Sequence, residues 1–257
     1  EIRDVALADG EMAIAEELLR RGLRLIEGTG FLRGLQRCWH DLAAVLLTRD
    51  KLDEAAELTA RAREIAEKLE RVESIAALAN QQGEVARKQG DLASAEAFYR
   101  SALDAYVRVG RPTVLPRVNL ALVLRAQDQW DEVRPTLEVA RVAAADQGRR
   151  GLLLILDAFL LPCFARDGDW DAFDSAATAL SRFQEGSDRV DEDTAVSLEL
   201  AAEFAEAHNR PARAAAARRF AAVRWRALGR TTRADEVEAG LRLQDDEETT
   251  LVGRRPE

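Results

Sequence analysis

The apolar residues of the chain recur in one local arrangement about every 40 residues. A turn is followed by a bulky apolar residue, usually a small residue three positions later, and then a run with apolar residues at helical spacing. The recurrences begin at Met12, Leu52, Leu92, Trp130, Trp170 and Pro211, at intervals of 40, 40, 38, 40 and 41 residues. The pattern is therefore an internal repeat that covers most of the chain.

Residues 75–106 hold the clearest copy of this repeat. In its second half, Leu92, Ala95 and Tyr99 fall on one face of a helix, whereas Glu96 points away from that face. The first half has similar apolar spacing, and the turn at 89–91 separates the two halves. Each repeat is therefore predicted to be a pair of antiparallel helices.

The ends of the second helices carry a further signal. Glycines that suit a left-handed helix C-cap follow most of them, whereas the second repeat has Leu69-Glu70-Arg71 at this place. These glycines are Gly30, Gly110, Gly148, Gly186 and Gly229. We expect the helices to end at these residues.

The composition agrees with helices and limits the classes of function. Hydrophobic residues make up 47% and charged residues 32% of the chain, and aromatic residues only 5%, which is typical of a folded, helix-rich protein. The net charge of -9 argues against nucleic acid as a partner, because such surfaces neutralise phosphates with Lys and Arg. Apolar runs are too short to span a membrane, so no membrane contact is expected.

The repeated positions resemble the tetratricopeptide repeat (TPR) family, in its long variety of about 40 residues per repeat. Gly83, Ala95, Tyr99 and Ala102 match the small, small, aromatic and small positions of that family. Small residues suit points where two helix backbones approach closely, and large residues fill the holes beside them. The same frame assigns equivalent positions to Trp39, Ala43, Ala55, Ala62, Ala121, Ala140, Ala202, Ala214 and Ala221.

Repeats three and four depart from the family pattern. Phe173 occupies a small position, and Pro135 and Pro162 lie inside predicted helices. Proline removes a backbone hydrogen bond and clashes with the preceding turn, so we expect kinked helices in these two repeats.

The resemblance implies an all-α fold, a right-handed α-solenoid of stacked antiparallel helix hairpins over residues 1–244. Counting back from the first recurrence leaves only the tail of a first helix, at Ile2 to Leu7, so the first repeat is expected to be truncated and five complete hairpins to follow it. Residues 231–244 are expected to form a capping helix that begins at Thr231 or Thr232, with Glu236 completing a capping box.

Residues 245–257 are predicted to be an acidic linker toward a missing downstream domain. Their end, 251–257, resembles the start of bacterial AAA-type ATPase domains and also the first strand of forkhead-associated domains. Thr249 and Thr250 follow four acidic residues and resemble the phosphothreonine sites that forkhead-associated domains bind. An inert spacer is the alternative interpretation.

Motifs for catalysis and for cofactors are missing from the sequence, which has no phosphate loop, no dinucleotide fingerprint and no H-E-x-x-H. With only His40 and His208, a histidine metal site is not expected. Cys38 and Cys163 lie far apart in apolar segments and are expected to be buried thiols of a reducing cytosol. We expect a cytoplasmic protein that is not an enzyme and that holds no cofactor and no metal.

The resemblance also implies a groove, lined by the first helices of the repeats, that binds extended or helical peptides. The family's groove positions correspond here to Arg37, His40, Asn80, Glu84, Arg87, Val118, Arg125, Glu199, Glu203 and Glu206. Arg87 and Arg125 are candidates for clamping a carboxylate of the peptide. The alternative is that they are ordinary solvated charges.

Residues 210–233 carry eight arginines and no acidic residue. These are Arg210, Arg213, Arg218, Arg219, Arg224, Arg226, Arg230 and Arg233. A basic helix of this kind could dock an acidic partner or nucleic acid. The alternative is a solvated outer helix whose charges are neutralised by neighbouring acidic segments.

The function that the resemblance implies is a protein–protein interaction scaffold, as a fragment of a multidomain bacterial signal-transduction or transcription regulator. Its expected partners are protein or peptide segments, including adjacent domains of the same polypeptide. The alternative is a ligand- or peptide-sensing domain that controls an attached ATPase or kinase module.

Overall fold

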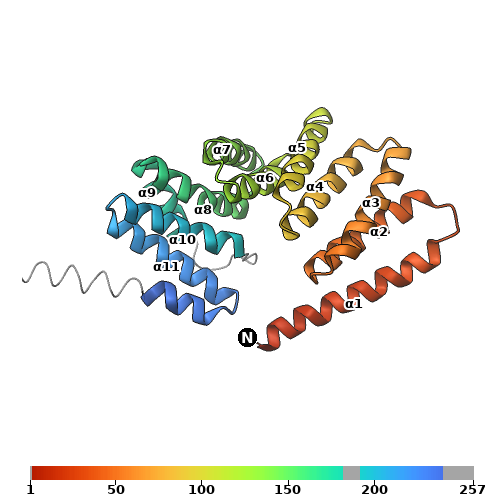
Figure 1. Cartoon of the computed structure of the whole chain (residues 1–257), viewed down its shortest axis with the longest axis horizontal. Helices are drawn as coiled ribbons and strands as arrows, with labels where there is room; N and C mark the ends of the chain where they lie inside the picture. Colours follow the sequence, from red (N-terminus) through yellow and green to blue (C-terminus); the bar gives the residue numbers. More distant parts are fainter. Residues whose placement is uncertain (1, 182–191, 240–257) are drawn as a thin grey trace, which may run out of the picture. The chain divides into compact units, whose positions relative to one another are not determined.

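The computed structural model describes the backbone of residues 2–181 and 192–239, and side chains from Gly10 onward. Within these residues the chain forms helices and turns and no strand, so the predicted all-α class is confirmed. The helices are α1 (Ile2–Ile26), α2 (Leu32–Thr48), α3 (Leu52–Lys68), α4 (Val72–Lys88), α5 (Leu92–Arg108), α6 (Val114–Ala126), α7 (Trp130–Asp146), α8 (Arg150–Asp167), α9 (Trp170–Ser181), α10 (Glu192–Ala207) and α11 (Pro211–Ala227) (Figure 1). A further helix covers 231–239.

The helix boundaries follow the repeat predicted from the sequence. The second helices α3, α5, α7, α9 and α11 begin at Leu52, Leu92, Trp130, Trp170 and Pro211, the residues at which the apolar pattern recurs. The helices α2/α3, α4/α5, α8/α9 and α10/α11 pack together as pairs, and α1 precedes them. These pairs agree with the predicted hairpins, and α6 and α7 follow each other in the same order along the chain.

The predicted C-cap glycines that lie in the described residues have the backbone conformation expected of a helix end. Gly30, Gly110, Gly148 and Gly229 have φ angles between 63° and 74°, in the left-handed region that glycine adopts readily. Glu70, in the repeat that lacks a glycine, has a φ of 51°. Gly186 lies outside the described residues.

The N-terminal end of the array differs from the expectation, and the elements expected at the C-terminal end extend past the described residues. Ile2 to Leu7 continue directly into α1, whereas they were expected to be the tail of a separate helix. A lone glycine, Gly10, is tolerated inside a helix, and it does not interrupt α1. Residues 240–244 of the expected capping helix and the linker 245–257 lie outside the described residues.

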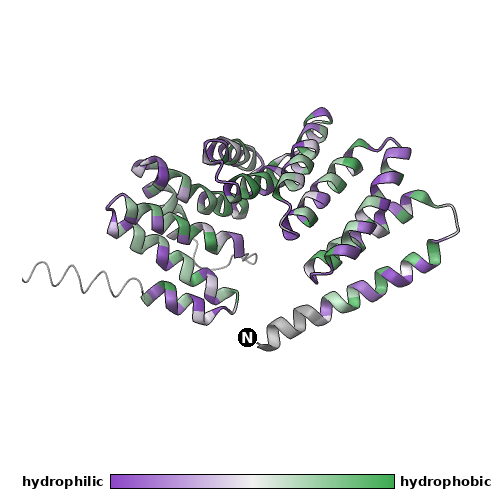
Figure 2. Cartoon of the chain, in the orientation of Figure 1, coloured by the Kyte–Doolittle hydropathy of each residue, from purple (hydrophilic) through white to green (hydrophobic). Residues whose placement is uncertain are grey.

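The small positions of the repeat frame are buried. Ala43, Ala55, Ala62, Ala95, Ala102, Ala121, Ala140, Ala202, Ala214 and Ala221 are each at most 2% exposed. Polar residues occupy the other faces of the helices, so most ribbons in Figure 2 alternate between hydrophobic and hydrophilic colours. The close helix contacts that the sequence pattern required are therefore present.

Repeats three and four accommodate their unusual residues inside continuous helices. Pro135 lies within α7 and Pro162 within α8, and both helices continue past the proline. Phe173 is 1% exposed and packs edge-on against Trp170 with ring centroids 6.0 Å apart. The large side chain at a small position is thus part of the core of this repeat.

The chain divides into two compact units, Glu1–Thr136 and Leu137–Glu257, with the boundary inside α7. In unit 1 the first helices α2, α4 and α6 are neighbours. Gln81 Nε2 on α4 donates to the His40 carbonyl on α2 at 3.0 Å, and Asn119 Nδ2 on α6 donates to Asn80 Oδ1 on α4 at 3.2 Å. In unit 2 the first helices α8 and α10 pack directly on each other.

Candidate functional site: a cavity between α2 and α4

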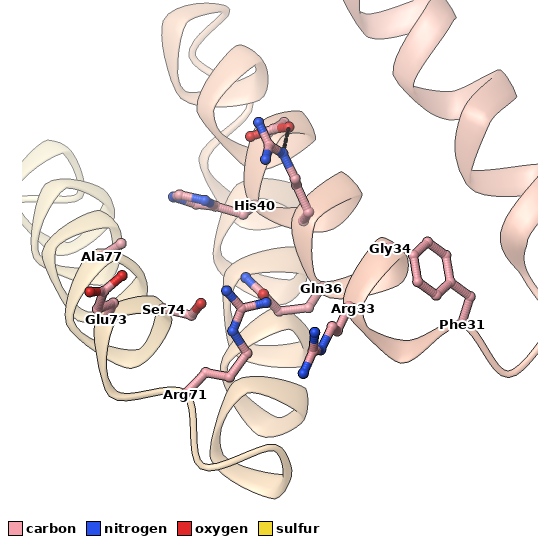
Figure 3. Close-up of a pocket in the computed structure, with 11 residues that line it drawn as sticks. Phe31, Arg33, Gly34, Gln36, His40, Arg71, Glu73, Ser74 and Ala77 are labelled. Atoms are coloured by element: carbon pink, nitrogen blue, oxygen red, sulfur yellow. Dashed lines mark ion pairs between the residues drawn. The ribbon is translucent and has the colours of Figure 1, made fainter.

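A cavity of about 560 Å³ lies in unit 1 between the first helices α2 and α4 (Figure 3). One wall comes from the turn before α2 and from the first half of that helix, and the other from the start of α4. The lining residues are Phe31, Arg33, Gly34, Gln36, Arg37, His40, Asp41, Arg71, Glu73, Ser74 and Ala77. Two of the predicted groove residues, Arg37 and His40, are among them.

The α2 wall carries an ion pair and a half-buried imidazole. Arg37 Nε lies 3.6 Å from Asp41 Oδ2, a contact within one helix face between two well-exposed side chains. Burial lowers the pKa of His40; the carboxylate of Asp41 opposes this shift and the guanidinium of Arg37 adds to it. At neutral pH, His40 therefore presents a neutral ring, which can donate or accept a hydrogen bond.

The α4 wall begins at Arg71, the residue just before the helix, and continues with Glu73 and Ser74. Glu73 Oε1 is paired with Arg111 Nε at 2.7 Å. The hydrogen bond from Arg111 lowers the pKa of the Glu73 carboxyl. This acidic side chain is thus neutralised from the next repeat, outside the cavity lining.

The other groove residues predicted in unit 1 lie farther along α4 and α6. Asn80 on α4 and Asn119 on α6 contact each other. Arg87 and Arg125 are each the residue before the last in their helices, and Glu84 lies one turn before Arg87. Val118 is 8% exposed, so it contributes mainly to the core. None of these residues lines the cavity between α2 and α4.

The three predicted groove acids of unit 2 lie on α10, and two of them are paired with arginines. Glu199 accepts from Trp225 Nε1 and from Arg233, and Glu206 forms an ion pair with Arg218. Glu203 is exposed and borders a smaller cavity of about 210 Å³. Two of these predicted groove acids, Glu199 and Glu206, thus have partners within the chain.

The charges of the arginine-rich segment 210–233 are partly neutralised by neighbouring acidic residues, in agreement with the interpretation of this segment as a solvated outer helix. Four of its arginines form ion pairs with acidic residues of α9, α10 or the helix at 231–239. The pairs are Arg213–Asp174, Arg218–Glu206, Arg226–Asp235 with Glu238, and Arg233–Glu199 with Glu236. Arg210 and Arg213 also stack over Trp170, at 5.5 and 5.3 Å from its ring centroid.

Other reactive groups are dispersed. Cys38 and Cys163 are both free thiols, and only Cys163 is fully buried, so the expectation of burial is confirmed for one of them. Within the described ranges no three His, Cys, Asp or Glu side chains come together to hold a metal ion. Among the helices that the structure describes, none is long and apolar enough to cross a membrane.

Apart from Arg37 and His40, the residues that line the cavity were not among the predicted groove positions; four of those missed are Arg33, Gln36, Arg71 and Ser74. The family's groove positions lie in the middle and at the end of the first helices, whereas these four lie in the first turns of α2 and α4 or just before them. The signal that could have found them is the arginine that occurs at each of the two helix starts.

Comparison with known proteins identifies the fold. No protein-family model matches the sequence, and no curated protein is significantly similar to it. A Rap protein solved in complex with competence and sporulation factor has a TM-score of 0.64 at 16% identity, over 88% of this chain and 60% of the Rap chain. This chain thus spans about 60% of the length of that protein.

Two further solved structures are similar over more of their length. The apo form of RapI has a TM-score of 0.64 at 13% identity, over 92% of this chain and 81% of its own. BtubC from P. vanneervenii has a TM-score of 0.64 at 13% identity, over 96% of this chain and 94% of its own. A putative kinesin light chain with TPR-like repeats has a TM-score of 0.56. The likeness shows that the chain has the TPR-like α-solenoid fold.

Proposed function

We propose that this chain is a protein-interaction scaffold that binds a protein or peptide segment along the first helices of its repeats. The observation that carries the proposal is the cavity between α2 and α4, which is lined by polar and charged side chains of two adjacent first helices. Repeat proteins of this architecture present such surfaces to extended partners.

The repetition of polar side chains along unit 1 supports an extended partner. Arg87 and Arg125 are equivalent residues 38 positions apart, near the ends of α4 and α6, and the amides of Asn80 and Asn119 contact each other between these helices. A peptide backbone offers the same donors and acceptors at regular intervals. Amide and guanidinium groups that occur in successive repeats can therefore bind the backbone of an extended segment, largely independently of its side chains.

The setting of this scaffold is part of the proposal. A Rap protein of similar fold has been solved with competence and sporulation factor, which supports a signalling role. We place the chain in a multidomain bacterial signal-transduction or transcription regulator, with residues 1–244 as one array and 245–257 as a linker. Catalysis is assigned to no residue of this chain.

The test begins with selection of peptides from a display library on the purified chain. Binding of the selected peptides is then measured for the double variant Arg87→Glu/Arg125→Glu and for a control, Arg61→Glu, on the exposed face of α3. We expect at least about tenfold weaker binding for the double variant alone, since charge-assisted contacts are worth about 1.4 kcal/mol or more. Equal affinities of all three proteins would refute the groove as the site.

A second candidate function, a sensor of a small ligand, is favoured by the size of the cavity. Its volume of about 560 Å³ lies within the range of about 300–1,000 Å³ that is usual for small-molecule sites. A thermal-shift screen with metabolites distinguishes the two functions. A small molecule that raises the melting temperature of the wild type and not of His40→Ala would favour the sensor.

A further inference from the structure

The guanidinium groups of Arg33 and Arg71 and the amide of Gln36 point into the same end of the cavity between α2 and α4 (Figure 3). Arg33 lies in the first turn of α2, and Arg71 lies just before α4. The two arginines therefore come from different repeats and meet because the starts of α2 and α4 lie side by side. We call Arg33, Gln36, Arg71 and Ser74 the cavity end.

The two arginines of the cavity end are not paired with an acid. Among the lining acids, Asp41 is paired with Arg37 at 3.6 Å and Glu73 with Arg111 at 2.7 Å. Neither Arg33 nor Arg71 forms an ion pair with any of the residues that the structure describes. Glu73 also feels the charge of Arg71, but its own ion pair is with Arg111. Two exposed guanidiniums of like charge thus face one space with no acid paired to either of them, and an anion there would reduce their mutual repulsion.

Gln36 adds a polar amide to the cavity end. The residue is only 5% exposed, and its side chain is directed into the cavity end. Its amide makes no hydrogen bond to a described residue, and it is not among the buried polar groups that lack a partner, so its polar atoms are open to the cavity. The amide is therefore available to donate a hydrogen bond to a group that lies there.

We propose that the cavity end is a binding subsite for a phosphate monoester. A phosphoryl group carries about 1.5 to 2 negative charges at neutral pH and has three strong acceptor oxygens. It can therefore neutralise both arginines and accept from the Gln36 amide and the Ser74 hydroxyl as well. A single carboxylate would neutralise only one guanidinium and would offer fewer acceptor positions.

The remaining space suits the organic part of the ester. The whole cavity is about 560 Å³, far larger than a phosphoryl group, and its lining includes the apolar side chains of Phe31, which is 58% exposed, and Ala77. Two sources share this chemistry, a phosphorylated side chain of the bound segment and a free phosphorylated small molecule. A phosphorylated side chain as the ligand rests on the proposed peptide-binding function, whereas the subsite itself does not depend on that function.

The direct test is calorimetric titration of the chain with phenyl phosphate and with benzoate, its carboxylate counterpart. The variants are Arg33→Gln/Arg71→Gln and, as a matched control, Arg61→Gln on α3. We expect phenyl phosphate to bind the wild type and the control, with at least about tenfold loss in the double variant. Benzoate should bind at least about tenfold more weakly than phenyl phosphate. Equal binding of phenyl phosphate to all three proteins, or equal binding of both ligands, overturns the subsite.

The variant Gln36→Leu tests the amide separately. It should weaken phenyl phosphate binding several-fold and leave the unfolding midpoint of the free protein unchanged or higher, since the amide makes no hydrogen bond to a described residue. If it instead lowers the midpoint and leaves phenyl phosphate binding intact, Gln36 is a structural residue and the subsite loses this support.

A second arm distinguishes the sources and separates the two proposals. Selected peptides are resynthesised with phosphoserine or phosphotyrosine at their Ser or Tyr positions. Tighter binding of a phosphorylated form, lost in Arg33→Gln/Arg71→Gln, supports a phosphorylated segment. Phenyl phosphate binding without any peptide binding supports the subsite and rejects the scaffold function, whereas peptide binding without phenyl phosphate binding rejects the subsite alone.

Discussion

The ring of Tyr99 on α5 lies directly against the backbone of Gly83 on α4. A Cβ at residue 83 would lie 2.6 Å from Tyr99 Cε1, and Tyr99 is fully buried, so its ring has no room to move away. This contact sets how closely the two helices of the hairpin approach. It explains why a small residue at 83 occurs together with an aromatic residue at 99 in this repeat.

Replacement of Gly83 by Ala should therefore destabilise the protein. Overpacking a filled site costs about 1–3 kcal/mol, which we expect to outweigh the ~1 kcal/mol that Ala gains over Gly in a helix. The matched control is Gly22→Ala in α1, where no atom lies within 4 Å of the new Cβ, so only the favourable helix term remains. Urea unfolding should show opposite signs for the two variants; a gain for Gly83→Ala would contradict the packing described here.

Glu70→Gly should stabilise the protein by about 0.5–1 kcal/mol. Glu70 ends the second repeat with a φ of 51°, a conformation that costs energy for a residue with a Cβ. The reverse change at the equivalent place of the next repeat, Gly110→Ala, should destabilise, because Gly110 has a φ of 64°. Thermal unfolding measures both. A loss of stability in Glu70→Gly would mean that the lost side chain or the flexible unfolded chain matters more.

Glu16→Gln should weaken the attachment of α1 to the turn between α2 and α3. Glu16 is 6% exposed and accepts hydrogen bonds from Lys51, Arg20 and Arg49. Loss of these charged bonds should cost about 1.5–3 kcal/mol at pH 7. The exposed neighbour Glu17, changed to Gln, serves as the control and should have little effect on urea unfolding.

The Glu16 variant also has a defined pH dependence. The hydrogen bond from Lys51, opposed by burial and assisted by Arg20 and Arg49, lowers the pKa of Glu16 from 4.5 to about 2. A carboxyl with a depressed folded pKa contributes stability above its unfolded pKa and loses it as the pH falls. The difference in unfolding free energy between wild type and Glu16→Gln should be full above pH 4.5 and shrink toward pH 2. A constant difference across this range would argue against the charge of Glu16 as the cause.

Arg141→Ala should destabilise unit 2 more at neutral than at acidic pH. Asp157, 3% exposed in α8, accepts from Arg141 Nε at 2.6 Å, and burial raises the pKa of Asp157 although Arg141 acts against this shift. Without the arginine, the ionised carboxyl is left buried, so stability should fall as the pH rises through its raised pKa. In unfolding experiments the double variant Arg141→Ala/Asp157→Leu should recover stability at pH 7; failure to recover would show that Arg141 acts through packing.

The helices could be predicted from the sequence because their boundaries depend on local patterns. Each second helix begins with an apolar residue after a turn, as at Leu92 and Trp130, and these features lie within a few residues of one another. The continuity of α1 could not be predicted in this way. Gly10 favours a turn in isolation, and the structure keeps it inside one helix.

The candidate site was less predictable because it depends on which charges find partners. The sequence shows that Glu199 and Glu206 share a helix face, but their pairing with Arg233 and Arg218 follows from the packing of α10 beside α11 and the helix at 231–239. Arg33 and Arg71 are 38 residues apart, and only the stacking of α2 beside α4 brings them to one cavity. A repeat pattern in the sequence therefore does not predict which charged residues of different repeats form ion pairs.

In unit 1 each helix packs on the helices next to it along the chain: α1 on α2, α3 on α2 and α4, and α5 on α4 and α6. An array with contacts of this kind can lose one repeat while the next remains folded. Under a mechanical load on its N-terminal end, unit 1 should thus lengthen in steps of one hairpin instead of rupturing at a single force. A segment held by its first helices would then be released repeat by repeat as tension grows.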